Sequence, residues 1–182
     1  MDINKIPRKS WVIPELVVGN SKIDGKGVFA TKDIKEGEVV TIWGGIVVTI
    51  DEFKAGKGMP HTNVGIDEGI FLAEPPDIDP DNMGVDEYTN HSCDPNLWLQ
   101  DEITLIAKRD IKAGEELTMD YAVELADASY VMKKPCNCGA KNCRKTITGK
   151  DWMLPEVQEV NKDHFSPFIN RRIQKLLNEK GQ

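Results

Sequence analysis

The chain has 182 residues, of which 40% are hydrophobic and 29% charged, and its formal net charge is −7. This length suits one domain with or without a small appendage, and the composition excludes disorder for most of the chain. No apolar stretch reaches the roughly 20 residues of a membrane span, the start lacks a signal peptide, and the acidic balance argues against broad nucleic-acid binding. We therefore expect a cytoplasmic or nuclear protein that contacts neither membrane nor nucleic acid directly, with specialised secretion as an open alternative.

Charge is unevenly distributed along the chain. Residues 58–107 contain eleven acidic residues and no Lys or Arg, whereas residues 133–150 contain six basic residues and no acid. A negative field of this kind attracts a basic partner. Solvated faces of opposite sign explain the two blocks equally well.

The first two thirds of the sequence predict short strands joined by turns. Strands are expected at residues 12–18, 39–43, 46–50 and 103–107, which are β-branched runs bounded by Gly, Asp or Pro. A short helix is expected from about Thr49, with Asp51 and Glu52 in its first turn, and another over residues 122–132. The prolines of residues 74–81 exclude a central strand, so an exposed acidic loop is expected there.

The end of the chain predicts a longer helix. Ser166 and Pro167 supply an N-cap and a first helical residue. Apolar residues follow at helical spacing: Phe168, Ile169, Ile173, Leu176 and Leu177. Such a stripe usually packs on its own core, and a membrane-surface or partner helix is the alternative. The predicted class is thus mainly β with a few short helices.

The four cysteines predict a zinc site. Cys136, Cys138 and Cys143 form a Cys-x-Cys-x4-Cys pattern, and Cys93 stands apart from them. Zinc takes four soft ligands in tetrahedral geometry, and Gly139 lets the chain turn between thiolates. The charge of such a site would be offset by nearby basic residues: Lys134, Lys141, Arg144 and Lys145. Two disulfides or free thiols are the alternatives, and the missing export signal disfavours the disulfides.

Three further motifs suggest chemistry when they are taken together. Residues 21–30 contain Gly25-Lys26-Gly27, where glycine allows a tight turn and a close approach of the backbone to a ligand. Residues 90–96 form a dense polar run that must be hydrogen-bonded if it is buried. Residues 111–121 indicate a turn and a strand that ends at Tyr121. Taken singly, each motif has a simpler explanation. The first two would be ordinary turns, and Tyr121 would be a tyrosine of the core.

In this order, and followed by the cysteines, the motifs resemble the SET-domain protein-lysine methyltransferases with a post-SET zinc-binding motif. The resemblance covers about residues 19–144 and implies the SET-domain fold: small curved sheets, a β-clip and a threaded C-terminal segment. It implies an N-terminal flank at 1–18, a SET domain at 19–132, a zinc-bound post-SET segment at 133–150 and a helical tail at 151–182.

The resemblance also implies a function. It is S-adenosylmethionine-dependent protein-lysine N-methylation by in-line transfer, with a basic, histone-like or other Lys-rich protein or peptide as substrate. The implied cofactor-binding residues are Lys26, Gly27, Asn90, His91 and Tyr121. Tyr121 is the implied catalytic residue, which orients the lysine amine, because a phenol of ordinary pKa is a poor base at neutral pH. One structural Zn²⁺ is implied on Cys93, Cys136, Cys138 and Cys143.

Some positions depart from the family pattern. Trp43, Tyr88 and Met119 are expected in the substrate channel, although Trp43 replaces a common tyrosine and a tyrosine at position 88 is more typical of core packing. Met119 replaces a Phe or Tyr that commonly limits the number of methyl groups, so we expect di- or trimethylation. Glu87 replaces a frequent arginine, and we expect it to face the substrate or solvent.

Other functions and placements are weighed against this one. A non-catalytic zinc-stabilised SET-like interaction module is supported by Trp43 and Met119 and opposed by the retained Tyr121, Asn90 and His91. A hydrolase with a catalytic zinc is disfavoured, because four thiolates leave no open coordination position. Trp152 is expected either over the zinc segment near the adenine or in the core. The helical tail is expected to cover part of the substrate groove or to join two copies as a homo-oligomer.

Overall fold

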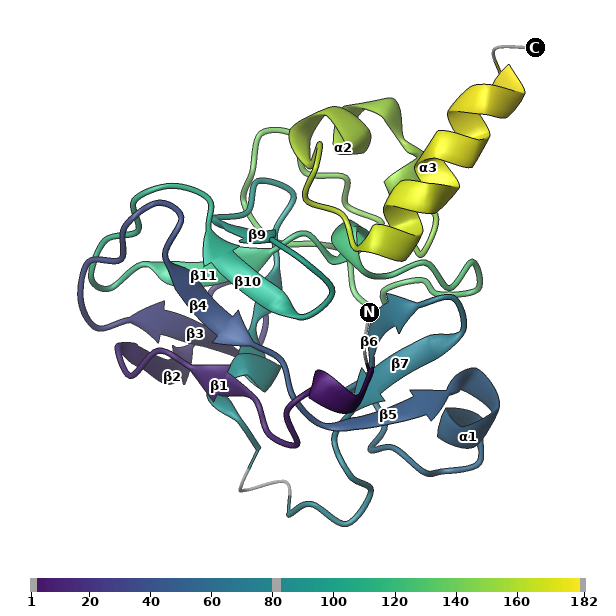
Figure 1. The fold of residues 1–182 in the computed structure, drawn as a ribbon. Helices are drawn as coiled ribbons and strands as arrows, with labels where there is room; N and C mark the ends of the chain where they lie inside the picture. The colour runs from purple at the N-terminus through teal and green to yellow at the C-terminus, as the bar shows by residue number, and fades with distance from the viewer. Residues whose placement is uncertain (1–2, 80–82, 181–182) are drawn as a thin grey trace.

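The structure is a computed structural model that describes residues 3–79 and 83–180. Within these residues, three small β-sheets form the body of the molecule, and short helices lie in the connections and at the C-terminal end (Figure 1). The strand orders are β1-β4-β10-β9, β2-β3-β11-β8 and β5-β7-β6. The predicted class, mainly β with a few short helices, is confirmed.

The elements have the following bounds. The strands of the first sheet are β1 (Trp11–Val12), β4 (Val39–Ile42), β9 (Leu97–Leu99) and β10 (Thr104–Ala107). The second sheet contains β2 (Leu16–Asn20), β3 (Lys26–Ala30), β8 (Asn90–His91) and β11 (Glu116–Met119), and the third β5 (Ile46–Thr49), β6 (Val64–Asp67) and β7 (Ile70–Ala73). The α-helices are α1 (Ile50–Lys54), α2 (Pro155–Val160) and α3 (Pro167–Lys180). The 3-10 helices are η1 (Ile3–Lys5), η3 (Val85–Tyr88), η4 (Tyr121–Val123) and η5 (Asp151–Met153).

Three of the four predicted strands are confirmed to within a residue, as β4, β5 and β10. The strand predicted at residues 12–18 is wrong as a single element. The chain turns at Pro14 and Glu15, so that β1 pairs with β4 in one sheet while β2 pairs with β3 in another. Proline has no N–H to donate to a ladder, which explains why the strand is interrupted there.

The short helix predicted from Thr49 is confirmed as α1. Thr49 Oγ1 accepts a hydrogen bond from Glu52 N at 3.2 Å, and Thr49 N donates to Glu52 Oε2 at 2.9 Å. This reciprocal capping box satisfies backbone donors that the first turn of a helix leaves unpaired. Two local side chains therefore place the start of the helix.

The helix predicted over residues 122–132 is wrong. The chain forms only η4 there and then continues through turns to an isolated bridge between Val131 and Thr148. Asp127 Oδ1 accepts hydrogen bonds from the backbone N and the hydroxyl of Ser129 at 2.9 and 2.7 Å. Such local side-chain bonds offer the backbone an alternative to helical pairing.

The C-terminal helix packs on the main core, as one of the two sequence interpretations expected. Phe168, Ile169 and Ile173 are buried together with residues of the first two sheets, whereas Leu177 is 52% exposed. Arg172 anchors the helix, since Nε and Nη2 donate to the Glu68 carboxylate at 2.8 and 2.6 Å. Beyond this anchor, α3 projects away from the sheets (Figure 1).

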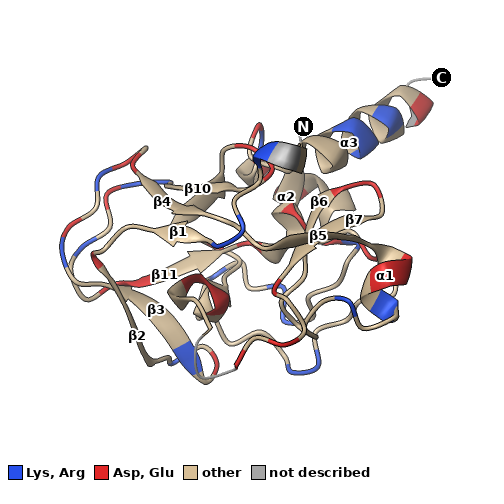
Figure 2. Ribbon diagram, turned by 60° about the horizontal axis from the view of Figure 1, so that its bottom comes forward, with Lys and Arg blue, Asp and Glu red and all other residues tan. Residues whose placement is uncertain are grey.

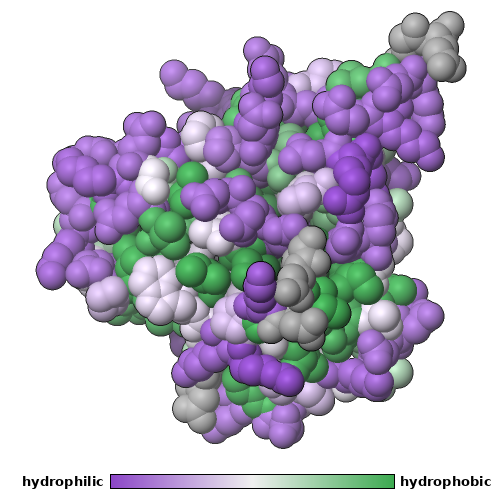
Figure 3. All heavy atoms as spheres, viewed as in Figure 1, coloured by the Kyte–Doolittle hydropathy of each residue, from purple (hydrophilic) through white to green (hydrophobic). Residues whose placement is uncertain are grey.

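The surface is mixed in polarity and charge. Acidic residues lie on α1 and basic residues on α3 (Figure 2), and the part of α3 seen in Figure 3 is largely hydrophilic. The expected acidic loop is exposed at Pro76 and Asp77, but Glu74 is buried at 8% exposure, and Pro80 and Asp81 lie outside the described residues. Among the described residues, we find no helix with the length and apolarity needed to cross a membrane.

Candidate functional site

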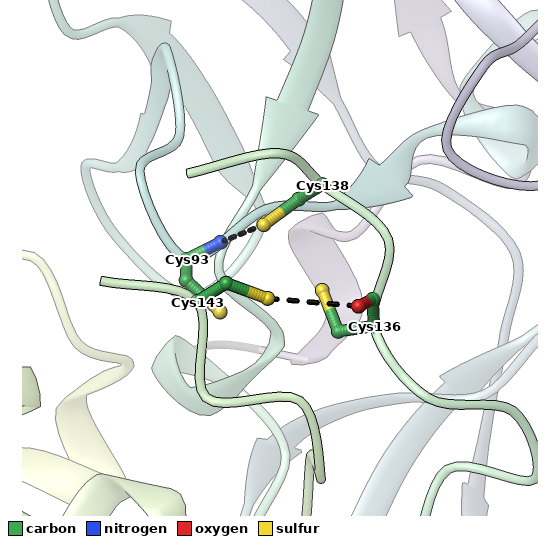
Figure 4. Close-up of side chains that lie close together, drawn as sticks. All are labelled: Cys93, Cys136, Cys138 and Cys143. Atoms are coloured by element: carbon green, nitrogen blue, oxygen red, sulfur yellow. Dashed lines mark hydrogen bonds between the residues drawn. The ribbon is translucent and has the colours of Figure 1, made fainter. Parts of the chain in front are cut away.

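The four cysteines come together at one point. Cys93 follows β8, and Cys136, Cys138 and Cys143 come from the irregular segment after η4, so that the side chains converge from different parts of the chain (Figure 4). Their four Sγ atoms lie within 4.8 Å of one another, and none forms a disulfide. Four thiolates at about 2.3 Å from a zinc ion would be about 3.8 Å apart. The cluster therefore fits one tetrahedral zinc ion.

Backbone N–H groups stabilise two of the sulfurs as thiolates, whereas burial raises the pKa of the Cys93 and Cys136 thiols. Cys138 Sγ accepts a hydrogen bond from Cys93 N at 3.5 Å, and Cys93 Sγ accepts one from Arg144 N at 3.3 Å. Ile147 is fully buried beside the cluster. Of the basic residues expected to offset the charge, Arg144 donates its backbone N–H to Cys93 Sγ but directs its guanidinium to Asp120 and Asp151, and Lys134 Nζ lies 2.7 Å from the Asp24 carboxylate.

A second group of side chains gathers around Glu116 in the sheet that contains β3, β8 and β11. Ser21 Oγ lies 2.8 and 3.0 Å from the two oxygens of the Glu116 carboxylate, and Asn90 Nδ2 lies 2.9 Å from Oε1. Asn90 Nδ2 also donates to Lys26 O at 2.8 Å. The structure thus brings together Lys26, Gly27 and Asn90, three of the expected cofactor-binding residues.

Glu116 also explains why a glycine stands at position 27. A Cβ atom on Gly27 would lie 2.2 Å from Glu116 Oε1, well inside contact distance. The Glu116 carboxylate is fixed by its hydrogen bonds, so it has little room to move away. Beside this turn, Lys26 Nζ lies 5.4 Å from the centre of the Tyr88 ring, which places a cation over an aromatic face.

Tyr121 is positioned by the pairing of β8 with β11. These strands run parallel, with Met119 opposite His91, and Tyr121 follows two residues after Met119 as the first residue of η4. The rings of His91 and Tyr121 lie 5.1 Å apart, and Tyr121 Oη donates to Thr89 O at 3.1 Å. Burial raises the pKa of the Tyr121 hydroxyl above its ordinary value. The phenol is therefore protonated at neutral pH, which suits an orienting group and not a base.

His91 connects Tyr121 with the cysteine cluster. Its Nδ1 accepts a hydrogen bond from Tyr121 N at 3.2 Å, and its Nε2 lies 3.3 Å from Cys93 Sγ. Burial lowers the pKa of His91 to about 4, so the ring is neutral at pH 7. Because Nδ1 acts as acceptor, the hydrogen-bond network assigns the ring proton to Nε2, which faces the sulfur.

The three expected channel residues belong to one apolar region. Trp43 and Met119 are 6% and 5% exposed in the main core, and Tyr88 and Tyr121 pack against that core. Their placement in a substrate channel stays a prediction. Trp152 also lies in the main core, where its Nε1 donates to Gly149 O at 3.1 Å, so the interpretation as a core tryptophan fits the structure.

Two carboxyl groups differ from what the sequence suggests. Glu87, expected to face substrate or solvent, is half-buried, and burial together with the nearby Asp86 raises its pKa to about 8. Glu124 carried no signal in the sequence, yet it is buried and its Oε2 accepts a hydrogen bond from Gly65 N at 2.9 Å. Burial raises the pKa of Glu124 to about 8 as well.

The raised pKa of Glu124 predicts a pH-dependent stability. An unfolded glutamate titrates near pH 4.3, so between about pH 5 and 8 the folded state holds the extra proton and the free energy of unfolding falls as the pH rises. Glu124→Gln keeps the acceptor for Gly65 N and removes the proton. We expect the fall between pH 5.5 and 8.5 to shrink by at least about 1 kcal/mol. Urea unfolding at several pH values measures it, with the exposed Glu36→Gln as control, and identical profiles for Glu124→Gln and the unsubstituted protein would contradict the assignment.

Comparisons with known proteins agree with this arrangement. The SET domain family model matches residues 25–122. Human histone-lysine N-methyltransferase 2B is 35% identical over 147 residues, which are 71% of this chain and 5% of that protein. Among solved structures, Arabidopsis thaliana SUVH6 in complex with SAM has a TM-score of 0.58 at 22% identity, over 72% of this chain and 32% of that one. KRYPTONITE in complex with mCHG DNA and SAH has a TM-score of 0.56 at 26% identity, over 72% of this chain and 28% of that one.

Proposed function

Since the chain belongs to the SET-domain family, we propose that it is an S-adenosylmethionine-dependent protein-lysine N-methyltransferase. The observation that carries the proposal is the placement of Tyr121, which is half-buried against the main core, beside His91 and two residues after the end of β11. The name of the human relative and the SAH bound by KRYPTONITE support it. The chain spans a small part of each of these proteins, so the activity is inferred for this segment only.

The proposed reaction depends mainly on positioning. Methyl transfer is an in-line displacement, so the lysine nitrogen, the methyl carbon and the sulfur must be held nearly collinear. The nucleophile is a neutral amine, and an apolar surrounding such as the core near Trp43 and Met119 favours loss of the lysine proton. Tyr121 would orient the amine through its hydroxyl, and the oxygen complements the partial positive charge on the methyl group.

The cofactor would be held by Lys26, Gly27, Asn90, His91 and Tyr121. S-adenosylmethionine supplies the methyl group when bound. The donor set fits such a molecule, because an ammonium group, an amide and glycine backbone suit the carboxylate and amine of an amino acid. The cysteine cluster would hold one structural Zn²⁺, with all four coordination positions filled by thiolate.

The substrate would be a basic protein or peptide, histone-like or otherwise rich in lysine. The acidic residues of 58–107 support this class where they are exposed, as Asp77 and Asp94 are, since exposed carboxylates create a negative field that attracts a basic chain. The names of the relatives support histone-like proteins. Such a substrate would place the protein in the cytoplasm or nucleus.

The test is incubation of the zinc-loaded protein with methyl-labelled S-adenosylmethionine and a mixture of basic proteins that includes histones. We expect label on lysine residues of at least one of them. No transfer to any member of a broad lysine-rich panel, together with no cofactor binding by calorimetry, would instead favour the non-catalytic interaction module. Label on a residue type other than lysine would contradict the proposed reaction.

Met119 predicts the degree of methylation. Its thioether is flexible and has no hydroxyl to hold a water molecule, so the site should accept an already methylated amine. We expect di- and trimethyl-lysine at long reaction times, and a shift toward monomethyl-lysine in Met119→Tyr. Mass spectrometry of the product measures the distribution, with Met153→Tyr, 41% exposed, as the matched control. Only monomethyl product from the unsubstituted protein would show that the prediction is wrong.

A further inference from the structure

Arg144 forms a buried ion-pair network next to the cysteine cluster. Its Nη1 and Nη2 donate to Asp120 Oδ2 and Oδ1 at 2.8 and 2.7 Å, and its Nε donates to Asp151 Oδ2 at 2.8 Å. The side chains of Arg144, Asp120 and Asp151 are 12%, 1% and 6% exposed. A two-pronged guanidinium–carboxylate pair of this kind fixes direction as well as distance.

This network joins two segments that are distant in the sequence. Arg144 directly follows Cys143, and its backbone N donates to Cys93 Sγ at 3.3 Å. Asp120 directly precedes Tyr121. One residue therefore links the cysteine cluster to the end of β11, through its backbone N–H on one side and its guanidinium on the other.

The Asp120 carboxylate acts on both sides of Tyr121. Asp120 directly precedes Tyr121 in the chain. Its Oδ1 accepts a hydrogen bond at 3.0 Å from the backbone N of Ala122, the residue that follows Tyr121. Tyr121 N itself donates to His91 Nδ1, whose ring meets Cys93 at the other nitrogen. The backbone of Tyr121 is thus held from the cysteine cluster by two routes, one through His91 and one through Arg144 and Asp120.

We propose that Arg144 is a positioning residue for Tyr121, acting through Asp120. This inference rests on the proposed methyltransferase function for its kinetic consequence. Lysine at position 144 would keep the positive charge but present one point of contact instead of a planar fork, so the carboxylate would lose its fixed direction. Tyr121 would then lose part of its alignment while the cysteines and the cofactor-binding residues stay in place.

The kinetic expectation is a selective loss of kcat. For Arg144→Lys and for Asp120→Asn we expect kcat to fall by about tenfold or more, with KM for cofactor and substrate within about threefold and one zinc ion retained per chain. The double variant should be no slower than the worse single variant, because both changes break the same contact. Arg109→Lys is the matched control. Arg109 also pairs with a carboxylate, that of Glu115, but this pair lies before β11 and the Arg109 side chain is exposed.

A spectroscopic readout tests the position of Tyr121 without turnover. The chain has three tyrosines, so 3-fluorotyrosine labelling gives three fluorine resonances, with Tyr121 identified by Tyr121→Phe and Tyr88 as the internal reference. We expect the Tyr121 resonance to shift or broaden in Arg144→Lys and Asp120→Asn, and to stay unchanged in Arg109→Lys.

Several outcomes would overturn the inference. One is an unchanged Tyr121 resonance in both variants. Another is loss of zinc or of cooperative unfolding in both, which would make the network a structural support only. If the unsubstituted protein transfers no methyl group, the proposed function fails, while the fluorine spectra still decide whether Arg144 positions Tyr121.

Discussion

Replacing Tyr121 with Phe is expected to reduce methyl transfer at least about 100-fold, while the affinity for S-adenosylmethionine changes by less than about threefold. The phenyl ring would keep the packing against His91, whose ring centre lies 5.1 Å away. The hydroxyl and its hydrogen bond to Thr89 O would be lost. The variant therefore removes the oxygen that would orient the amine and leaves the surrounding fold.

The measurement is kcat from label transfer, together with calorimetric titration of the cofactor. Tyr130→Phe is the matched control, because Tyr130 is half-buried on the same connecting segment and is not among the proposed site residues. We expect Tyr130→Phe to retain most of the activity. A Tyr121→Phe variant with more than half of the original kcat would contradict the role assigned to the hydroxyl.

Replacing Cys138 with Ser is expected to abolish tight zinc binding and methyl transfer together. The cysteine cluster is supported by a very small apolar core around Ile147, so without a metal the segment has little else to hold it. Loss of this segment would release Arg144 and the sulfur that His91 faces, and both contacts lead to Tyr121. The cluster is therefore expected to matter for activity although the zinc would have no open position.

Zinc content by elemental analysis and the unfolding temperature by calorimetry measure this effect. We expect about one zinc ion per chain in the unsubstituted protein, less than about a tenth of that in Cys138→Ser, and a clearly lower unfolding temperature. Lys141→Ser, on an exposed residue of the same segment, should change neither quantity. Full zinc occupancy in Cys138→Ser would show that the four cysteines do not form one site.

Local sequence signals predicted the elements that local contacts determine. The capping residues Thr49 and Glu52 lie three positions apart, and α1 begins where they predict. Pro14 was an equally local signal. The single strand predicted across it proved wrong, because the residues before Pro14 pair in one sheet and those after Glu15 pair in another. The turn stabilised by Asp127 and Ser129 competed with a helix whose apolar spacing was weak.

The candidate site was predicted only in part, for a related reason. Cys93 was grouped with the other cysteines by count and chemistry, and their Sγ atoms do converge. The contact of Glu116 with Gly27 depends on how β11 pairs with β3, and that of Arg144 with Asp120 joins segments far apart in the sequence; no periodicity encodes either. Long-range polar contacts of this kind become visible only in three dimensions.

The most direct test of the central claim follows the methyl group itself. The zinc-loaded protein is incubated with deuteromethyl-labelled S-adenosylmethionine and a lysine-rich histone-like protein, and tandem mass spectrometry locates the label. We expect the deuterated methyl group on a lysine side-chain nitrogen, and its absence when Tyr121→Phe is used. The absence of both lysine label, across a broad panel of basic proteins, and cofactor binding would contradict a methyltransferase and leave a zinc-stabilised interaction module.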